Sequence, residues 1–351
     1  MRTARFVIGL VGLTGAGCSS SQQAAKVEGA EVTALTVSTS APALAIEPPP
    51  AEEIYHARPP LSGPKRDLEF KSLPVRFPSG RAQLANGEVI VDVVNWQTVA
   101  VADLADGETC TAALIGPRVI LTAAHCVDAE DRQNPRRTIG GSVRFVSGAH
   151  DIVSCEMHDR YAAADLPAER VPRSSEDWAL CELDSSPAIV IETLAISPAA
   201  ARNEPILMMG YGCIDIYVFA NQLSWNSGGG LLRQGDGVIE AVGVGNASTA
   251  AGSYVRTRAP GREPILCPGD SGGPAFRNAT VANPGVQGRR VLAVNSRVTA
   301  IPQGGSYTFY SFLSPVTAPS FSSWLGRWRG DNRWRRVCGL GPRPETGTCR
   351  T

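Results

Sequence analysis

The chain has 351 residues, which is longer than one average domain, although an all-β barrel or sandwich of more than about 200 residues commonly forms a single unit. Its 33 basic and 33 acidic residues cancel, so no net charge attracts nucleic acid or an anionic membrane surface, and nucleic acid is not an expected partner. An apolar content of 43%, with 36 glycines and only 19% charged residues, is typical of a soluble globular protein rich in turns.

Residues 1–17 are typical of an export signal. Two arginines precede the apolar run from Phe6 to Leu13, and a stretch of small residues then ends at Cys18. The segment also resembles a bacterial lipoprotein signal, in which Cys18 would be lipidated after cleavage before it, although Gly15 stands where such signals usually carry leucine. An ordinary secretory signal with an incidental Cys18 is the alternative. Both interpretations predict an exported protein, either tethered to the cell envelope and its membrane through a lipid or secreted.

Residues 18–83 are rich in Ala, Ser, Thr and Pro and contain few aromatic residues. Such a composition buries too little apolar surface to offset the entropy that ordering costs. We therefore expect a disordered tether or pro-segment, followed by a globular domain that begins near residue 84.

From residue 84 onward, short apolar runs alternate with Gly, Pro and Asp, which predicts many short strands and little helix. This pattern indicates an all-β barrel or sandwich. One helix is expected late in the chain, at Pro319–Trp328. The predicted strands are residues 88–94, 98–104, 118–124, 142–148, 188–194, 205–212, 237–245, 289–296 and 307–313.

Nine cysteines are dispersed along the chain, and lipidation of Cys18 would leave an even number, eight, for pairing. An exported protein meets an oxidising compartment, which favours disulfides. A zinc site is the competing interpretation, but the sequence contains no CxxC or HxxxH pair. We therefore expect disulfides, no metal and no cofactor.

Three short motifs carry residues suited to nucleophilic catalysis. An apolar run bracketed by Cys110 and Cys126 ends in LTAAHC, which contains His125; Asp177 opens DWALCEL; and Ser271 lies within GDSGGP. Each motif alone has a plain structural explanation, because a lone histidine is usually structural and Gly, Asp, Ser and Pro also build tight turns. Their order and spacing, 52 residues from His125 to Asp177 and 94 from Asp177 to Ser271, set them apart.

With these motifs, residues 84–328 resemble the chymotrypsin/trypsin family of serine proteases (S1-type). The resemblance implies a fold of two six-stranded antiparallel β-barrels with the active site in the cleft between them and a short C-terminal helix. Residues 329–351 would then form a tail with a small disulfide loop. Composition and periodicity alone indicate only an all-β fold.

The same resemblance implies a catalytic triad. A serine hydroxyl is a poor nucleophile until a neutral imidazole takes its proton, which assigns His125 as the base for Ser271. Asp177 would orient and stabilise the imidazolium. The backbone N–H groups of Gly269 and Ser271 would stabilise the oxyanion of the tetrahedral intermediate. Other acidic residues near this stretch keep the choice of acid open: Asp151, Asp159 and Asp165.

Activation by cleavage is a second implication. In this family Asp270 would receive the new N-terminal amine, and residues 84–96 resemble the mature start, with Leu84 where isoleucine usually stands. Arg81 lies three residues before Leu84, but Gln83 directly precedes the expected bond. The sequence therefore leaves two alternatives, cleavage by another protease or activity without cleavage.

Disulfide pairing also follows from the resemblance. Cys110–Cys126 corresponds to the bridge beside the catalytic histidine, and the runs DIVSCEM and DWALCEL should be neighbouring strands of the first barrel. The family's usual partner for Cys213, downstream of the nucleophile, is absent, which leaves Cys267, and Cys338 and Cys349 then remain for the tail. The expected pairs are Cys110–Cys126, Cys155–Cys181, Cys213–Cys267 and Cys338–Cys349.

The resemblance also assigns residues to the pocket for the substrate residue before the scissile bond (P1). Ile265 stands where a trypsin carries its acid, which argues against strict cleavage after Lys or Arg. Asn295, Ser296 and Arg297 would line the pocket wall, and bulk at Arg297 and Thr308 should narrow it and favour small apolar P1 residues. Arg297 turned inward would instead favour an acidic P1. A shift in this alignment by a residue or more is a further alternative.

The sequence thus predicts an exported, monomeric serine endopeptidase that acts on proteins or peptides. A catalytically silent binding module with the same fold is the alternative, and an esterase is disfavoured because the GxSxG motif is not set in an α/β pattern. Residues 327–336 contain five arginines and two tryptophans, which fits an anionic ligand or, more simply, a solvated helix end.

Overall fold

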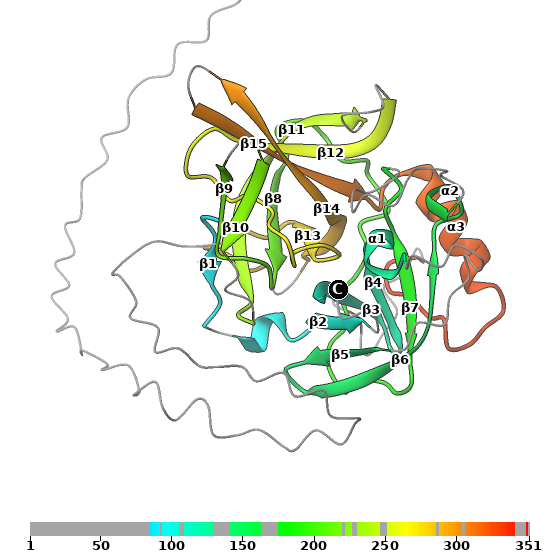
Figure 1. Ribbon diagram of the computed structural model, residues 1–351. Coiled ribbons are helices and arrows are strands. Elements are labelled where there is room, and N and C mark those ends of the chain that lie inside the picture. The colour runs from blue at the N-terminus through cyan, green and yellow to red at the C-terminus, as the bar shows by residue number, and fades with distance from the viewer. Residues whose placement is uncertain are drawn as a thin grey trace, which may run out of the picture. The chain divides into compact units, whose positions relative to one another are not determined.

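The computed structural model describes residues 84–91, 93–104, 109–128, 141–162, 175–219, 222–226, 230–245, 251–285, 288–303, 306–340 and 349 (Figure 1). The expected export signal, Cys18 and the expected tether up to residue 83 lie outside the described residues. All statements below concern the described part of the chain.

The N-terminal half of this part forms a closed antiparallel barrel in the order β2-β3-β4-β7-β6-β5. Its interior is apolar, because β3 and β4 are buried along nearly their whole length. Cys155 of β6 lies opposite Cys181 of β7, so the predicted pairing of these two strands is confirmed. The strands are β2 (Val99–Leu104), β3 (Thr109–Gly116), β4 (Val119–Thr122), β5 (Gly141–Phe145), β6 (Gly148–Met157) and β7 (Ala179–Leu183).

The C-terminal half forms a second antiparallel ring in the order β8-β11-β12-β15-β14-β13, which closes because β13 and β11 both pair with β8. A short strand, β1, adds to β11 outside the ring. The two rings of six strands confirm the fold class expected from the sequence. The strands are β1 (Glu88–Val89), β8 (Pro205–Gly210), β11 (Arg233–Val244), β12 (Ala251–Ala259), β13 (Pro274–Arg277), β14 (Arg290–Gln303) and β15 (Ser306–Pro315).

The apolar run 188–194 connects the rings and is not a strand, so that prediction is wrong. Within it, Ile191 and Leu194 form only isolated bridges, to Cys349 and Val291. Glu192 donates to Leu114 of the first barrel at 3.0 Å. Thr193 accepts from Val291 of the second ring at 2.9 Å, and Ala195, just after the run, donates to Val291 at 2.8 Å. Ile191 and Leu194 are buried, which explains why a connector has the apolar pattern of a strand.

Two further strands, β9 (Asp215–Phe219) and β10 (Gln222–Asn226), form a separate two-stranded ribbon that the sequence did not predict. The short helical segments are η2 (Val93–Trp96), α1 (Ala124–Val127) and α2 (Asp159–Ala162).

The predicted C-terminal helix is confirmed as α3 (Pro319–Arg329), with proline in its first turn. Its buried aromatic residues pack on the first barrel: Phe321 lies edge-on to Trp178, and Trp324 lies edge-on to His158. The helix therefore ties the end of the chain back to the barrel that carries His125.

Four disulfides are present, and they are the four pairs expected from the sequence: Cys110–Cys126, Cys155–Cys181, Cys213–Cys267 and Cys338–Cys349. No group of His, Cys, Asp and Glu among the described residues is arranged to hold a metal ion. A search of the same residues finds no helix long and apolar enough to cross a membrane.

Candidate active site

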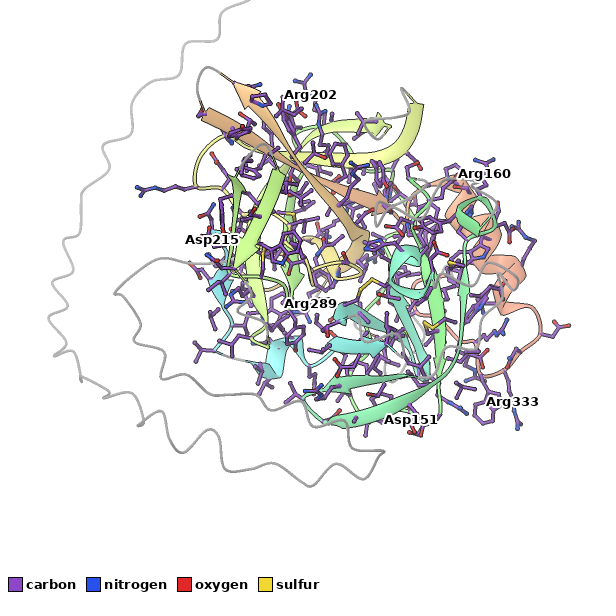
Figure 2. The ribbon with its side chains drawn as sticks, in the orientation of Figure 1. Asp151, Arg160, Arg202, Asp215, Arg289 and Arg333 are labelled. Carbon is purple, nitrogen blue, oxygen red and sulfur yellow. A yellow bond between two sulfur atoms is a disulfide. The ribbon has the colours of Figure 1, made fainter. Side chains whose placement is uncertain are left out.

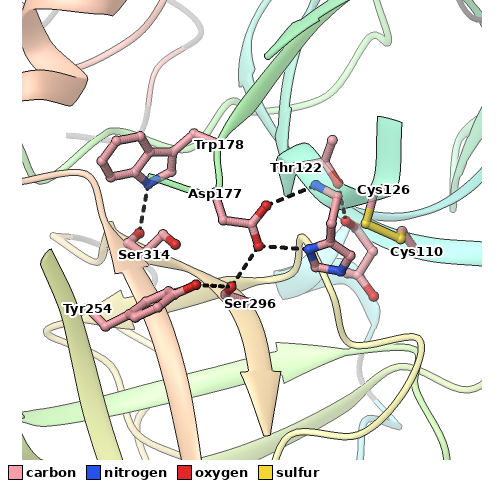
Figure 3. Close-up of polar contacts among 10 residues, drawn as sticks. Cys110, Thr122, Cys126, Asp177, Trp178, Tyr254, Ser296 and Ser314 are labelled. Carbon is pink, nitrogen blue, oxygen red and sulfur yellow. Dashed lines mark hydrogen bonds and ion pairs between the residues drawn. A yellow bond between two sulfur atoms is a disulfide. The ribbon is translucent and has the colours of Figure 1, made fainter. Parts of the chain in front are cut away.

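His125 is carried on the single turn α1, which begins where β4 leaves the first barrel. Asp177 lies just before β7 and is fully buried. Its Oδ1 accepts the backbone N–H of His125 at 2.9 Å, and its Oδ2 lies 2.7 Å from the ring Nδ1 (Figure 3). An ionised carboxylate can only accept hydrogen bonds, so Nδ1 carries the proton and Nε2 keeps its lone pair as a base.

The carboxylate of Asp177 accepts a third hydrogen bond from the second ring, where Ser296 Oγ donates to Oδ2 at 2.6 Å (Figure 3). The competing acids lie elsewhere. Asp151 is exposed on β6 (Figure 2), and Asp159 forms an exposed ion pair with Arg327 at 2.5 Å. Asp165 lies outside the described residues. The hydrogen bonds of the described residues therefore favour Asp177 as the partner of His125.

The loop that contains Ser271 packs directly on the segment that leads to His125. Gly272 has a φ of +82°, and a Cβ at this position would overlap Thr122 Oγ1 and lie 2.9 Å from the backbone nitrogen of Ala123. The carbonyl oxygen of Ser271 accepts the N–H of Thr111 at 2.8 Å. A side chain at Gly272 would therefore push the loop away from the histidine, which explains why glycine follows the serine.

The same loop presents two backbone amides that have no acceptor among the residues the structure describes. The N–H groups of Asp270, Gly272 and Gly273 donate to backbone carbonyls at 2.8–2.9 Å. Within the described part of the chain, those of Gly269 and Ser271 donate to no acceptor. Gly269 has a φ of +97°, a left-handed conformation that favours glycine. These two amides are therefore available to a developing oxyanion.

The hydroxyl of Ser271 makes no hydrogen bond to another described residue. Its position relative to His125 is fixed through the backbone, because Ser271 is bonded to Thr111 and the neighbouring Cys110 is bridged to Cys126. In serine hydrolases the contact between nucleophile and base is often long before substrate arrives and tightens in the complex.

Asp270 is buried beneath the loop. Its Oδ1 accepts the N–H of Gly212 at 2.8 Å and its Oδ2 accepts the N–H of Cys267 at 2.9 Å. Burial raises the pKa of Asp270 to about 7, while those two amides and the cation of Arg233 offset part of the rise. In this single chain the carboxylate is thus held by backbone amides. Leu84, the expected first residue after cleavage, is fully buried in the apolar core of the second ring.

The residues assigned to the P1 pocket do not share one environment: one is packed among apolar side chains, and two make hydrogen bonds in the interior. Ile265 is buried in an apolar cluster beside Cys267, and its N–H donates to Ala85. Asn295 is buried, and its Nδ2 donates to the carbonyl of Met209 at 2.8 Å. Ser296 reaches Asp177 rather than a pocket wall.

Arg297 and Thr308 are not brought together. In the register of β14 and β15, Arg297 lies opposite Phe312, and Thr308 lies opposite Ile301, four residues farther along. At about 3.3 Å per residue this separates the two positions by roughly 13 Å. The register therefore does not favour a joint narrowing of one pocket by Arg297 and Thr308, and the sequence alone could not show this register.

Tyr254 is a part of the site that the sequence did not reveal. Its hydroxyl lies 3.3 Å from Ser296 Oγ (Figure 3). Burial raises the pKa of this hydroxyl. Trp178 donates its indole N–H to the carbonyl of Ser314 at 3.0 Å and so joins β7 to the second ring. Trp178 follows Asp177 in the motif DWALCEL, whereas Tyr254 belongs to no motif, and only the register of the strands places it here.

A histidine oriented by a buried carboxylate, beside a glycine loop with free amides, defines the class of site found in serine hydrolases. A model of the trypsin family matches residues 93–325, well over half of the chain, so the chain belongs to the trypsin family. A solved structure described as a Glu endopeptidase in complex with MPD is similar, with 13% sequence identity and a TM-score of 0.45. That match covers 69% of this chain and 96% of the other. A comparison with curated protein sequences gave no match.

Proposed function

We propose that the protein is a serine endopeptidase that cleaves peptide bonds through an acyl-enzyme on Ser271. Ser271 Oγ attacks the scissile carbonyl while His125 Nε2 takes its proton, which forms the C–O bond of a tetrahedral intermediate. The imidazolium then gives that proton to the leaving amine as the C–N bond breaks. Water enters by the same route and releases the acid and the free serine.

Asp177 and the loop amides stabilise the charges of this cycle. Asp177 holds the positive charge of the imidazolium through the Nδ1 contact of 2.7 Å and remains ionised. The amides of Gly269 and Ser271 bind the oxyanion. Removing one such donor typically costs about 2.7–4 kcal/mol of transition-state stabilisation.

One observation carries the proposal: the buried carboxylate of Asp177 accepts both N–H groups of His125, while Gly272 lies against the same turn. A binding module without catalysis has no need for this arrangement. A fluorophosphonate probe tests the difference, because it phosphonylates only a serine whose base and oxyanion amides are assembled.

The probe should add one phosphonyl group to Ser271, identified by mass spectrometry of the tryptic peptide. Ser271→Ala and His125→Ala are the matched controls and should remain unlabelled. Lack of labelling of both the full chain and a chain beginning at Leu84 would favour the silent binding module. Labelling without cleavage of any peptide, but with hydrolysis of simple esters, would favour an esterase.

Strict cleavage after Lys or Arg is not part of the proposal. The position where an acid would hold such a side chain is Ile265, which is 2% exposed and packed in an apolar cluster. A charged P1 side chain at this point would lose its hydration without gaining a partner. A peptide library with Lys or Arg preferred at P1 would contradict this.

We further propose that the enzyme is exported and monomeric, with its four disulfides formed in an oxidising compartment. Cys18 would provide a lipid tether if the N-terminal signal is of the lipoprotein type. Metabolic labelling with a fatty-acid analogue, compared with a Cys18→Ala variant, tests the tether. Activity of the full chain before and after removal of residues 1–83 tests whether cleavage before Leu84 is needed.

A further inference from the structure

Arg297 stands on the strand that is directly bonded to the nucleophile loop. The backbone of Asn295 accepts the N–H of Gly272 and donates to the carbonyl of Gly273, both at 2.8 Å. Arg297 lies two residues farther along β14, about 7 Å at the usual rise of a strand. The ladder between β14 and β15 is irregular between these residues, and such a bulge commonly re-aims side chains at an active site.

The guanidinium of Arg297 has donors that the protein does not satisfy. Its Nε is buried and has no partner among the described residues, and its Nη2 makes one long hydrogen bond, 3.4 Å, to Thr299 Oγ1. Its carbon Cζ lies 5.5 Å from the ring centre of Phe312, so the group is stacked on one face. A partly buried cation with an unmet donor is costly, and an anionic ligand would offset that cost.

Two other arginines of the second ring, Arg256 and Arg277, have carboxylate partners, whereas Arg233 of β11 has a buried Nε without a partner among the described residues but lies within reach of two backbone carbonyls. Arg256 donates to Glu240 at 2.6 and 2.8 Å and stacks over Tyr310, and Arg277 donates to Glu204. No carboxylate of a described residue forms an ion pair with Arg297. Burial lowers the pKa of Arg297, and the charge of Asp177 offsets part of that effect. The oxygens of Asp177 already accept hydrogen bonds from His125 and Ser296.

We propose that Arg297 binds the carboxylate of an acidic P1 side chain, so that the protease prefers Glu or Asp before the scissile bond. This inference rests on the proposed function. An ionised carboxylate matches the planar fork of a guanidinium and supplies two acceptors for the unmet donors. The alternative, a small apolar P1 residue in a pocket narrowed by Arg297 and Thr308, loses its basis because the register separates those two positions.

Peptides that are identical except for Glu or Gln at P1 test the proposal, because the two residues differ in charge and hardly in shape. With the full chain, and with the chain beginning at Leu84, kcat/KM for the Glu peptide should exceed that for the Gln peptide about 100-fold. In Arg297→Gln this ratio should fall to within about threefold of one. Arg297→Lys, which keeps the charge but not the fork, should retain an intermediate ratio.

Arg256→Gln is the matched control, since it removes a partly buried, aromatic-stacked arginine from the same ring, and it should leave the Glu/Gln ratio unchanged. Equal rates for the two peptides, acid preference only at another substrate position, or an unchanged ratio in Arg297→Gln would overturn the inference. If Arg297→Gln does not fold, the ratio of kcat/KM for the Glu and Gln peptides in the parent protein and in Arg297→Lys tests the inference instead. A labelled Ser271 without acid preference overturns this inference alone, whereas an unlabelled Ser271 overturns the proposed function with it.

Discussion

Ser296 of the second ring donates a hydrogen bond of 2.6 Å to Asp177 of the first barrel, so the acid that orients His125 is held by residues from both rings. Asp177 precedes β7, and Ser296 belongs to β14, which is also bonded to the nucleophile loop through Asn295. Movement of one ring against the other would therefore disturb the base and the nucleophile together.

Ser296→Ala should lower kcat/KM about tenfold, which corresponds to about 1.4 kcal/mol, because Asp177 loses one donor but keeps both contacts with His125. Tyr254→Phe is the matched control: it removes a hydroxyl 3.3 Å from Ser296 Oγ but no donor of Asp177, and it should change kcat/KM less than about threefold. Steady-state kinetics on one peptide measures both. Equal effects of the two variants would contradict a specific role for the Ser296–Asp177 bond.

Asp270 should make stability depend on pH. Its folded-state pKa of about 7 lies above the ordinary value of 3.8, so the folded protein holds a proton that the unfolded chain releases. The contribution of Asp270 to the free energy of unfolding is thus fully present at low pH, falls as the pH rises toward about 7, and is lost above it.

The measurement is the free energy of unfolding of the parent and of Asp270→Asn between pH 5 and 9. Asp270→Asn changes the free energy of unfolding by an amount that does not depend on pH, because its amide cannot accept from both Gly212 and Cys267. The informative quantity is therefore the slope against pH of the difference in this free energy between parent and variant. The parent should lose stability relative to the variant up to about pH 7 to 8, by at most about 1.4 kcal/mol per pH unit, and then level off. A difference that is flat across this range would show that Asp270 is ionised throughout.

Sequence motifs located the residues at the centre of the site, because LTAAHC and GDSGGP are short contiguous stretches whose residue types can be recognised without knowing their distant contacts. The closed rings were predicted less completely, because β12 and β13 were not among the expected strands. The connector at 188–194 was predicted to be a strand, because residues buried between two rings have the same apolar pattern as residues buried in a sheet. Strand register is a long-range property. It decides that Ser296 meets Asp177 and that Thr308 lies away from Arg297, and no local pattern specifies either.

Gly272→Ala should lower kcat/KM more than about 100-fold and prevent labelling of Ser271 by a fluorophosphonate. The added Cβ meets Thr122 Oγ1 and the carbonyl oxygen of Thr111, and the φ of +82° is costly for alanine by about 1–3 kcal/mol. Gly326→Ala in α3 is the control, since no atom lies within 4 Å of its added Cβ. It should leave activity unchanged and raise stability by about 0.5–1 kcal/mol. Full labelling of the Gly272→Ala protein would refute the close packing of the loop on the histidine turn.

The buried ion pair of Arg289 and Glu192 joins the second ring to the connector between the rings (Figure 2 labels Arg289). Both side chains are fully buried; Arg289 Nη2 lies 2.5 Å from Glu192 Oε1, and the guanidinium stacks on Trp96 at 3.9 Å. Thr98 also donates to Glu192 at 2.6 Å. Removal of one partner leaves the other charge buried without its counterion, so Glu192→Gln should lower the free energy of unfolding by about 3–5 kcal/mol.

Asp159→Asn is the matched control for Glu192→Gln, because it breaks the exposed pair with Arg327, whose side chains are 60% and 59% exposed, and should cost less than about 1 kcal/mol. Urea unfolding of both variants gives the comparison. The double variant Glu192→Gln with Arg289→Gln should recover part of the loss, because no uncompensated charge remains in the interior. A loss for Glu192→Gln no larger than that for Asp159→Asn would mean that water reaches the pair, and the connector would then owe its position to apolar packing at Ile191 instead.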